Sequence, residues 1–157
     1  MGWVKLNTDG SMYKAPIKAS GGGILRCSNG DWIAGFARKL RNISSTMDEL
    51  WALRDGLIMA KQLGIVNICI EMDVEFLVYL ASNPSVVNLM LEPFLTDCRD
   101  LIKTSPNYSV AHVFREANSC VNKLAGWEQS LILISIFCIT HWMWRLIYWL
   151  ERKLALL

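Results

Sequence analysis

Cysteine pairs at zinc-binding spacing are absent from this chain of 157 residues. Its five cysteines are scattered, and none belongs to a Cys-x-x-Cys pair. An odd, dispersed set argues against both a disulfide framework and a zinc site. It favours reduced thiols in an intracellular compartment such as the nucleus or cytoplasm. The N-terminal stretch MGWVKLNTD also lacks the apolar run of a secretory signal.

Charge of either sign is scarce as well. Charged residues make up 19% of the chain, hydrophobic residues 53%, and the formal net charge is +2. So small a net charge does not by itself predict a nucleic-acid partner, although it leaves one open. The apolar content excludes a disordered chain, and the length suffices for one domain with a core.

The first stretch with chemical content is Lys5–Ser11, which reads KLNTDGS. Apolar and polar residues alternate through it, as in a half-buried strand. We expect Asp9 at the end of that strand, where its carboxylate could hold a hard cation. The Asp-Gly pair is also a hairpin signal, so a simple turn is the competing interpretation. Gly10 would permit close approach of another backbone, or a positive φ.

A polar link is expected over Ser11–Ser20, followed by a hairpin. Two extended runs, Gly21–Cys27 and Trp32–Leu40, flank the Asn29-Gly30 pair, which is a type I′ turn signal. Together with the first strand they make three antiparallel strands. The triple glycine at 21–23 is no phosphate loop, because neither a helix nor a lysine follows it. A bulge or close packing explains it better.

The segment Ser44–Gly64 is predicted to be a helix, capped by Ser45 or Thr46 and closed by Gly64. Its polar residues Asp48, Asp55 and Gln62 recur every seven positions and are expected on the solvent face. Glu49 lies at the edge of the buried face. It is either a cation ligand or a surface acid that pairs with the helix dipole. The buried face consists of Glu49, Ala52, Leu53, Gly56 and Ala60.

The next segment, Ile65–Asp73, is predicted to be a strand parallel to the first, because a strand–helix–strand return requires a crossover. Asp73 would then end beside Asp9 at one edge of the sheet. It could also cap the following helix, Val74–Ser82. The later elements are a break at Asn83-Pro84, a helix within Val86–Thr104 with Pro93 near its start, and a last strand at Asn107–Phe114.

Several motifs together resemble the plant-type ribonuclease H domain, a family of retroelement polyproteins and small plant proteins. They are, in order, KLNTDGS, GGGILR, MDELWALRDGLIMAKQLG, ICIEMD and HVFREANSCVNKLA, within residues 3–126. The resemblance implies an α/β fold with a mixed five-stranded sheet, three antiparallel strands followed by two parallel ones, and flanking helices. It also implies an endonuclease that cuts the RNA strand of RNA–DNA hybrids with two Mg²⁺ ions, or Mn²⁺, and no small-molecule cofactor.

Carried over by motif, Asp9, Glu49 and Asp73 resemble the catalytic metal ligands of the family. The fourth position departs from the pattern, because Asn122 stands where the last catalytic aspartate belongs. Its amide oxygen can still coordinate a metal but supplies no charge. We therefore expect an impaired ribonuclease. The alternative is a retroelement-derived domain that binds nucleic acid with weak or no catalysis.

Three basic residues, Arg115, Arg38 and Lys39, are candidate phosphate contacts. A solvated basic run is the competing interpretation of Arg38 and Lys39. His112 is expected to be a packed or hydrogen-bonded strand residue rather than a catalytic one. Some relatives grip the hybrid with a basic helical insertion, and the corresponding stretch here, Asn83–Pro93, carries no Lys or Arg.

The composition changes at residue 127, and we expect an atypical hydrophobic segment over 127–157. Leu131–Leu150 is apolar nearly all round, and only His141 and Arg145 oppose membrane insertion. Three interpretations remain open. The segment could form a membrane or interfacial helix that makes a membrane contact, a helix packed on the sheet or on a partner, or a tail that does not fold.

Overall fold

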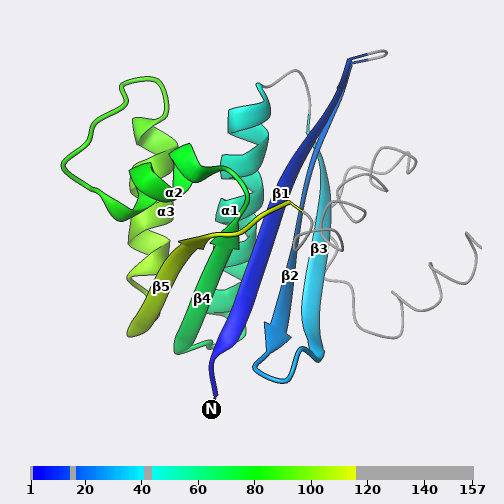
Figure 1. Cartoon of the computed structure of the whole chain (residues 1–157), viewed down its shortest axis with the longest axis vertical. Coiled ribbons are helices and arrows are strands. Elements are labelled where there is room, and N and C mark those ends of the chain that lie inside the picture. Colours follow the sequence, from blue (N-terminus) through cyan, green and yellow to red (C-terminus); the bar gives the residue numbers. More distant parts are fainter. Residues whose placement is uncertain (1, 15–16, 41–43, 116–157) are drawn as a thin grey trace, which may run out of the picture.

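The computed structural model describes residues 2–14, 17–40 and 44–115 (Figure 1). Within these ranges the chain forms one mixed sheet with the strand order β3-β2-β1-β4-β5. The β1–β2 and β2–β3 pairs are antiparallel, whereas β1–β4 and β4–β5 are parallel, so the predicted sheet is confirmed. The elements are β1 (Val4–Lys14), β2 (Ile17–Cys27), β3 (Trp32–Leu40), α1 (Ser45–Gln62), β4 (Asn67–Met72), α2 (Glu75–Ser82), α3 (Glu92–Ile102) and β5 (Asn107–His112).

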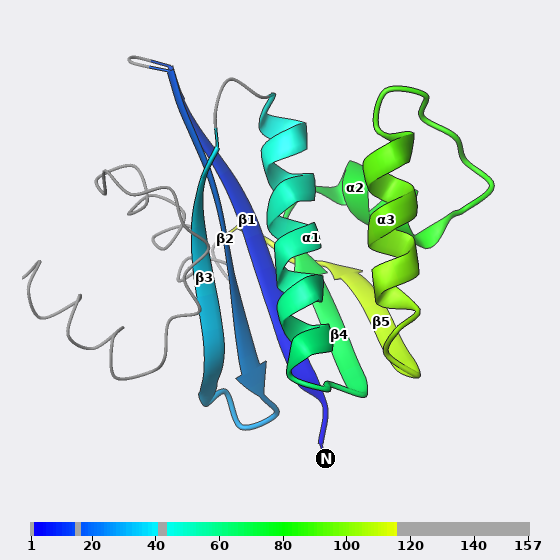
Figure 2. The same cartoon turned by 180° about the vertical axis from the view of Figure 1, so that it is seen from behind.

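Helices α1 and α3 cover the same face of the sheet (Figure 2). Small residues let α1 lie close to β1, because a Cβ at Gly56 would come 2.8 Å from a methyl carbon of Leu6. Leu6, Leu53 and Ile70 are completely buried in the core between the helices and the sheet. Burial of this apolar layer fixes α1, and with it Glu49, against β1.

The first three strands differ from expectation in two ways: β1 and β2 are longer, and the β2–β3 loop has another geometry. Three predictions are corrected as a result. No polar link separates β1 from β2, because the two pair continuously up to Lys14 opposite Ile17. Asp9 therefore lies within β1, opposite Gly22, and neither ends the strand nor forms a turn. The β2–β3 loop also differs from a type I′ turn. The Gly30 N–H bonds to the Cys27 carbonyl, and Gly30 has φ of 86°, as in a three-residue loop.

The N-cap of α1 lies one residue before the first of the two predicted caps. Ser44 is the N-cap, and its hydroxyl accepts a hydrogen bond from the Met47 N–H, so Ser45 and Thr46 belong to the helix itself. The predicted closure by Gly64 is confirmed. Gly64 has φ of 66° and donates to the Lys61 carbonyl, while Ile65 donates to the Ala60 carbonyl. These two bonds form a Schellman motif.

The expected solvent face of α1 is wrong for two of its three residues. Asp48 is 0% exposed and Asp55 is 4% exposed, whereas Gln62 is exposed. The seven-residue spacing identified a common side of the helix. It could not show that this side lies against the sheet, where Asp55 pairs with Arg38 of β3 and Asp48 lies beside Gly10 of β1.

The later elements follow the prediction with shifted bounds. Val74, not Asp73, is the N-cap of α2, so the capping interpretation of Asp73 is wrong. Pro93 stands at the start of α3 as expected. Asn122, the end of the predicted domain at 126 and the segment 127–157 with Leu131–Leu150 lie outside the described residues. No helix among the described residues is long and apolar enough to cross a membrane.

Candidate active site

Three carboxylates from separate parts of the chain meet at one place. Asp9 comes from β1, Glu49 from α1 just after its first turn, and Asp73 from the residue after β4. Each contributes one oxygen, and these oxygens lie within 4.8 Å of one another. Asp9 and Glu49 are buried, at 1% and 6% exposure. The sequence predicted this convergence, and the structure brings all three acids together.

Gly10 allows the two elements to come this close. A Cβ at Gly10 would lie 2.5 Å from the backbone nitrogen of Glu49, which is inside any real contact distance. The Gly10 backbone also hydrogen-bonds to the Glu49 side chain, which partly opposes the rise in the pKa of Glu49 that burial causes. Of the two predicted uses of Gly10, close approach is therefore the one observed.

Burial and the neighbouring charges disfavour ionisation of Asp9 and Glu49. Burial raises the pKa of Asp9 from its usual 3.8 to about 7, and the Asp73 charge adds to this rise while Arg115 opposes it. Burial, followed by the charges of Asp9 and Asp73, raises the pKa of Glu49 from 4.5 to about 9. Carboxylates that crowd together out of water require a cation if all of them are to be charged at neutral pH.

The donor set fits a divalent cation of the hard, oxygen-seeking kind. All three groups offer carboxylate oxygens, which Mg²⁺ and Mn²⁺ prefer over nitrogen or sulfur ligands. In addition, the Oδ1 atom of Asp73 is buried and has no hydrogen-bond partner in the structure. A buried carboxylate oxygen without a partner is destabilising unless something else binds it, and a metal ion at this cluster would do so.

The side chains of Arg115 and His112 lie beside Asp73. The Nε atom of Arg115 is 3.6 Å from the Oδ2 atom of Asp73, and the Arg115 side chain is 71% exposed. His112 lies at the end of β5, and its Nε2 atom is 3.3 Å from the Asp73 carbonyl oxygen. Its ring also packs edge-on against Phe114. This is the hydrogen-bonded strand histidine that the sequence predicted.

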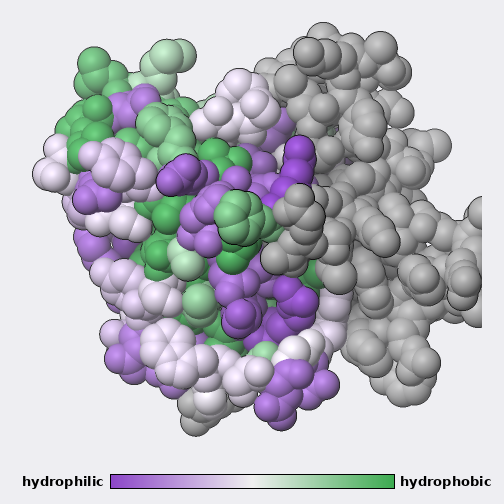
Figure 3. All heavy atoms as spheres, viewed as in Figure 1, coloured by the Kyte–Doolittle hydropathy of each residue, from purple (hydrophilic) through white to green (hydrophobic). Residues whose placement is uncertain are grey.

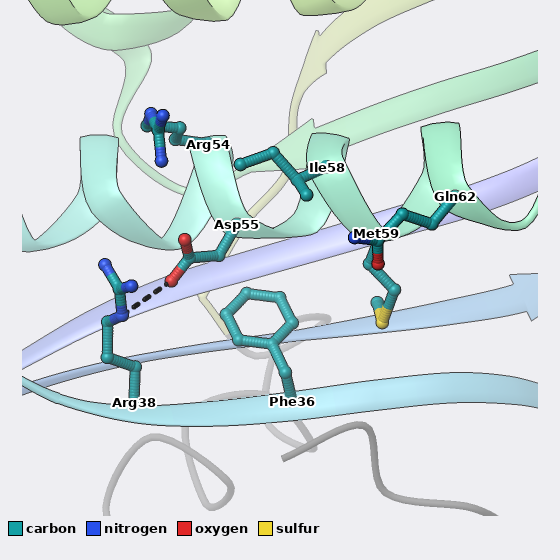
Figure 4. Close-up of a pocket in the computed structure, with 7 residues that line it drawn as sticks. All are labelled: Phe36, Arg38, Arg54, Asp55, Ile58, Met59 and Gln62. Atoms are coloured by element: carbon teal, nitrogen blue, oxygen red, sulfur yellow. Dashed lines mark ion pairs between the residues drawn. The ribbon is translucent and has the colours of Figure 1, made fainter. Parts of the chain in front are cut away.

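The other two predicted phosphate contacts lie on β3, away from the acids. Arg38 forms an ion pair with Asp55 of α1, with 3.0 Å between its Nε and the Oδ2 of Asp55 (Figure 4). Its guanidinium also lies 4.7 Å from the centre of the Trp51 ring. Arg38 thus has partners within the fold, unlike a solvated basic run. Lys39 is half-buried beside it on the same strand.

The loop between α2 and α3 is apolar on the surface. Leu89 and Met90 are each 89% exposed, and no basic side chain interrupts residues 83–93. Hydrophobic atoms accordingly cover the upper left of the molecule in Figure 3. This is consistent with the expected absence of a basic insertion.

Sequence reasoning did not single out Asn7 or Glu71, which stand two residues before Asp9 and Asp73. A usable signal was present, because residues two apart on a strand share one face of the sheet. Asn7 is buried and Glu71 half-buried, and the two lie on paired strands two positions before Asp9 and Asp73.

Comparisons with known proteins agree with this geometry. A family model described as "Reverse transcriptase-like" matches residues 7–128. A protein of Arabidopsis thaliana that carries the name "Putative ribonuclease H protein" is 32% identical over 133 residues, or 85% of this chain. The chain spans only 22% of the length of that relative.

Solved structures share the fold. Ribonuclease H1 from the archaeon Halobacterium salinarum gives a TM-score of 0.76 at 22% identity, covering 82% of this chain and 98% of its own. LC11-RNase H1 in complex with an RNA/DNA hybrid gives 0.71 at 19% identity, covering 79% and 94%. At these identities the likeness establishes the arrangement of strands and helices.

Proposed function

Because this chain belongs to the reverse transcriptase-like family and has the fold of ribonuclease H, we propose that it hydrolyses the RNA strand of RNA–DNA hybrids. The observation that carries the proposal is the convergence of Asp9, Glu49 and Asp73 within 4.8 Å. A relative named for ribonuclease H and a structural neighbour crystallised with an RNA/DNA hybrid both support this substrate class.

In this proposal the three acids hold divalent cations, Mg²⁺ or Mn²⁺. When bound there, two such ions would supply positive charge that stabilises the oxygens of the reacting phosphate. The chain's own contribution is positional. The sheet and α1 hold the carboxylates in place before substrate arrives, and Gly10 orients Glu49 through its backbone. Such preorganisation aims charge at the reacting phosphate without rearrangement during the reaction.

Substrate binding in this proposal relies on few basic groups. Arg115 is exposed beside Asp73, where a guanidinium can contact a phosphate next to the acids. Lys39 is a second candidate, whereas the partners of Arg38 within the fold leave it less available. Selection of the RNA strand would come from contacts to its 2′-hydroxyls, which DNA lacks.

A second candidate function is binding of nucleic acid without cleavage. One observation favours it: Asn122 replaces a carboxylate at the fourth position of the family pattern. The neutral amide would weaken cation binding on that side of the cluster, and Lys123 places a positive charge beside it.

Cleavage of a labelled RNA–DNA hybrid in Mg²⁺ and in Mn²⁺ tests both functions. Hybrid cleavage by the wild type, abolished in Asp9→Asn, supports the nuclease. The matched variant Asn122→Asp should cleave faster at lower metal concentration, because it restores a charged oxygen ligand. Single-stranded RNA and duplex DNA serve as substrate controls.

Two further outcomes separate the alternatives. A wild type that binds the hybrid but does not cut it, together with restored cleavage in Asn122→Asp, leaves the binding function. A wild type that neither binds nor cuts, with no gain in Asn122→Asp, overturns both proposals. Binding is measured separately by fluorescence anisotropy in EDTA, so that no hydrolysis interferes.

A further inference from the structure

A pair of polar side chains joins the two strands that carry Asp9 and Asp73. Asn7 of β1 and Glu71 of β4 are register partners in the parallel ladder. The Nδ2 atom of Asn7 donates a hydrogen bond to the Oε2 atom of Glu71 over 2.8 Å. Asn7 is 1% exposed, so this hydrogen bond forms out of water, where an unpaired amide would be strongly destabilising.

Two basic side chains contact this pair, Arg26 from β2 and the exposed Lys5 from β1. Arg26 of β2 donates through Nη2 to the Oδ1 atom of Asn7 over 2.6 Å, which fixes the direction of the amide. Lys5 donates through Nζ to the other oxygen of Glu71 over 2.7 Å. Hydrophilic residues lie over the central strands in Figure 3, which views the sheet face opposite α1. The chain of contacts therefore spans β2, β1 and β4.

The position of this pair is specific. Asn7 and Glu71 form the last registered pair between β1 and β4, because the backbone ladder does not continue to Asp9 and Asp73. Each member stands two residues before a metal-ligand candidate, and Asn7 lies on the same face of β1 as Asp9. The side-chain contact thus lies at the last registered pair of the β1–β4 ladder, two residues before the acids.

The acids themselves act against this contact. Oxygens of the Asp9 and Asp73 carboxylates lie within 4.8 Å of each other beyond this pair, and two negative charges at such a separation repel each other and push the strand ends apart. The hydrogen bond between Asn7 and Glu71, two residues earlier in each chain segment, resists that displacement. It would hold the two carboxylates at a separation that a single cation can bridge.

We propose that Asn7 and Glu71 form a cross-strand clamp that sets the separation of Asp9 and Asp73 and thereby the cation affinity of the cluster. The inference rests on the proposed function of the acids as metal ligands. Asn7 and Glu71 would act as positioning residues, since they bind each other and are not among the three clustered acids. Supporting partners of this kind change metal affinity by about 10- to 100-fold when they are removed.

The test is titration of the purified chain with Mn²⁺ alone, followed by calorimetry well below the melting temperature. Glu71→Ala should weaken Mn²⁺ binding by at least about ten-fold. Glu71→Gln keeps the side-chain length and an oxygen that accepts from Asn7, so it should retain most of the affinity. Lys5→Met is the matched control, because it removes an exposed ion pair to the same carboxylate and should stay within about five-fold.

A paired exchange covers the case in which Glu71→Ala does not fold. Asn7→Asp alone places two carboxylates against each other and should weaken Mn²⁺ binding. Adding Glu71→Gln exchanges donor and acceptor while keeping the total charge, so the double variant should recover the affinity. Recovery greater than the sum of the single effects is the signature of a direct contact.

Two results would overturn the clamp. Equal loss in Glu71→Ala and Glu71→Gln would mean that Glu71 acts through its charge alone. Unchanged Mn²⁺ affinity in Glu71→Ala, or no recovery in the double variant, would mean that the contact does not set the site. Both are read without substrate. A wild type that binds Mn²⁺ but leaves hybrids intact contradicts the nuclease proposal and does not affect the clamp.

Discussion

Gly10 and Glu49 lie closer than any residue with a side chain at position 10 would allow, with 2.5 Å between a Cβ built on Gly10 and the Glu49 backbone nitrogen. The same Cβ would come 2.7 Å from the carbonyl carbon of Asp48. Both contacts are with backbone, which cannot move aside as a flexible side chain can. The distance between β1 and α1, and so the reach of Glu49 toward Asp9, depends on the absence of a methyl group at this position.

Gly10→Ala should therefore displace the first turn of α1 and weaken cation binding. The inserted methyl overpacks a buried contact, and such changes cost about 1–3 kcal/mol of unfolding free energy. The loss of Mn²⁺ affinity should exceed what that destabilisation explains, because Glu49 moves relative to Asp9. Denaturant unfolding and calorimetric titration measure the two effects.

Gly2→Ala is the matched control. A Cβ at Gly2 would meet only the Ser28 hydroxyl oxygen, at 3.6 Å, which is an ordinary contact. Unfolding free energy and Mn²⁺ affinity should both stay at wild-type values. If Gly10→Ala behaves like Gly2→Ala, the close approach of β1 and α1 does not govern the site.

The carboxylate cluster should make the metal-free protein less stable as pH rises. Asp9 and Glu49 have usual pKa values of 3.8 and 4.5, and the fold raises these to about 7 and about 9. Between these limits the folded state binds more protons than the unfolded state. The free energy of unfolding therefore falls with increasing pH from about 4 to about 9. Urea unfolding in EDTA at several pH values measures this slope.

Metal should reverse that trend, because a bound cation favours the charged carboxylates and stabilises only the folded state. Unfolding in Mg²⁺ or Mn²⁺ should show added stability that grows with pH over the same range. Asp9→Asn should flatten the slope in EDTA, since it removes one titrating acid and one of the charges that raise the pKa of Glu49. A slope that is unchanged in Asp9→Asn would refute this assignment.

Much of the fold was predictable because its signals are local. Alternation marked β1, the small-residue face marked α1, and Gly64 marked the end of the helix. The length of β1 and β2 was not predictable from composition, since Ser11–Ser20, which contains Pro16, read as a link. The pairing of residues 11–14 is fixed by register with Ile17–Ser20, which is a relation between strands. A one-residue difference in the Gly30 loop likewise depended on hydrogen bonds that the Asn-Gly signal does not specify.

The candidate site, like the fold, was predictable from the sequence only in part. Asp9, Glu49 and Asp73 could be placed together because the crossover rule fixes which strand ends are neighbours. The burial of Asp48 and Asp55 could not be foreseen, because heptad spacing identifies a side of the helix without showing what packs against it. Asn7 and Glu71 were overlooked because their importance lies in their contact with each other. Asn122 lies outside the described residues, so its place at the site stays a prediction.

Arg38 should contribute more to stability than to hybrid binding. Its partner Asp55 has a side chain that is only 1% exposed, so removal of the arginine leaves a buried carboxylate without its ion pair. Arg38→Met should lower the free energy of unfolding by about 3 kcal/mol, the usual scale for breaking a buried pair from one side. Hybrid affinity, measured at a temperature where the variant is folded, should change little.

Two further variants make this prediction specific. Arg38→Met combined with Asp55→Leu should regain most of the lost stability, because no buried charge remains. Lys39→Met, on the same strand, should leave stability within about 0.5 kcal/mol. A hybrid affinity that falls more in Arg38→Met than in Lys39→Met would show that Arg38 contacts substrate despite its partners.

Arg115 should affect the metal and the substrate in opposite directions. Its guanidinium lies 3.6 Å from Asp73, and its charge partly opposes the rise in the pKa of both Asp9 and Glu49. A positive charge at that position repels an incoming cation, but it also attracts the phosphates of a nucleic acid. Because the side chain is largely exposed, each effect is screened by water and salt. Arg115→Ala should thus tighten Mn²⁺ binding by up to about five-fold and weaken hybrid binding.

The salt dependence of hybrid binding distinguishes a phosphate contact from a change in the acids. If Arg115 neutralises one phosphate, Arg115→Ala should reduce the slope of log K against log salt by about one. Arg115→Lys keeps the charge and should retain both the slope and the weaker Mn²⁺ affinity of the wild type. An unchanged slope in Arg115→Ala, combined with tighter Mn²⁺ binding, would confine the role of Arg115 to the electrostatics of Asp73.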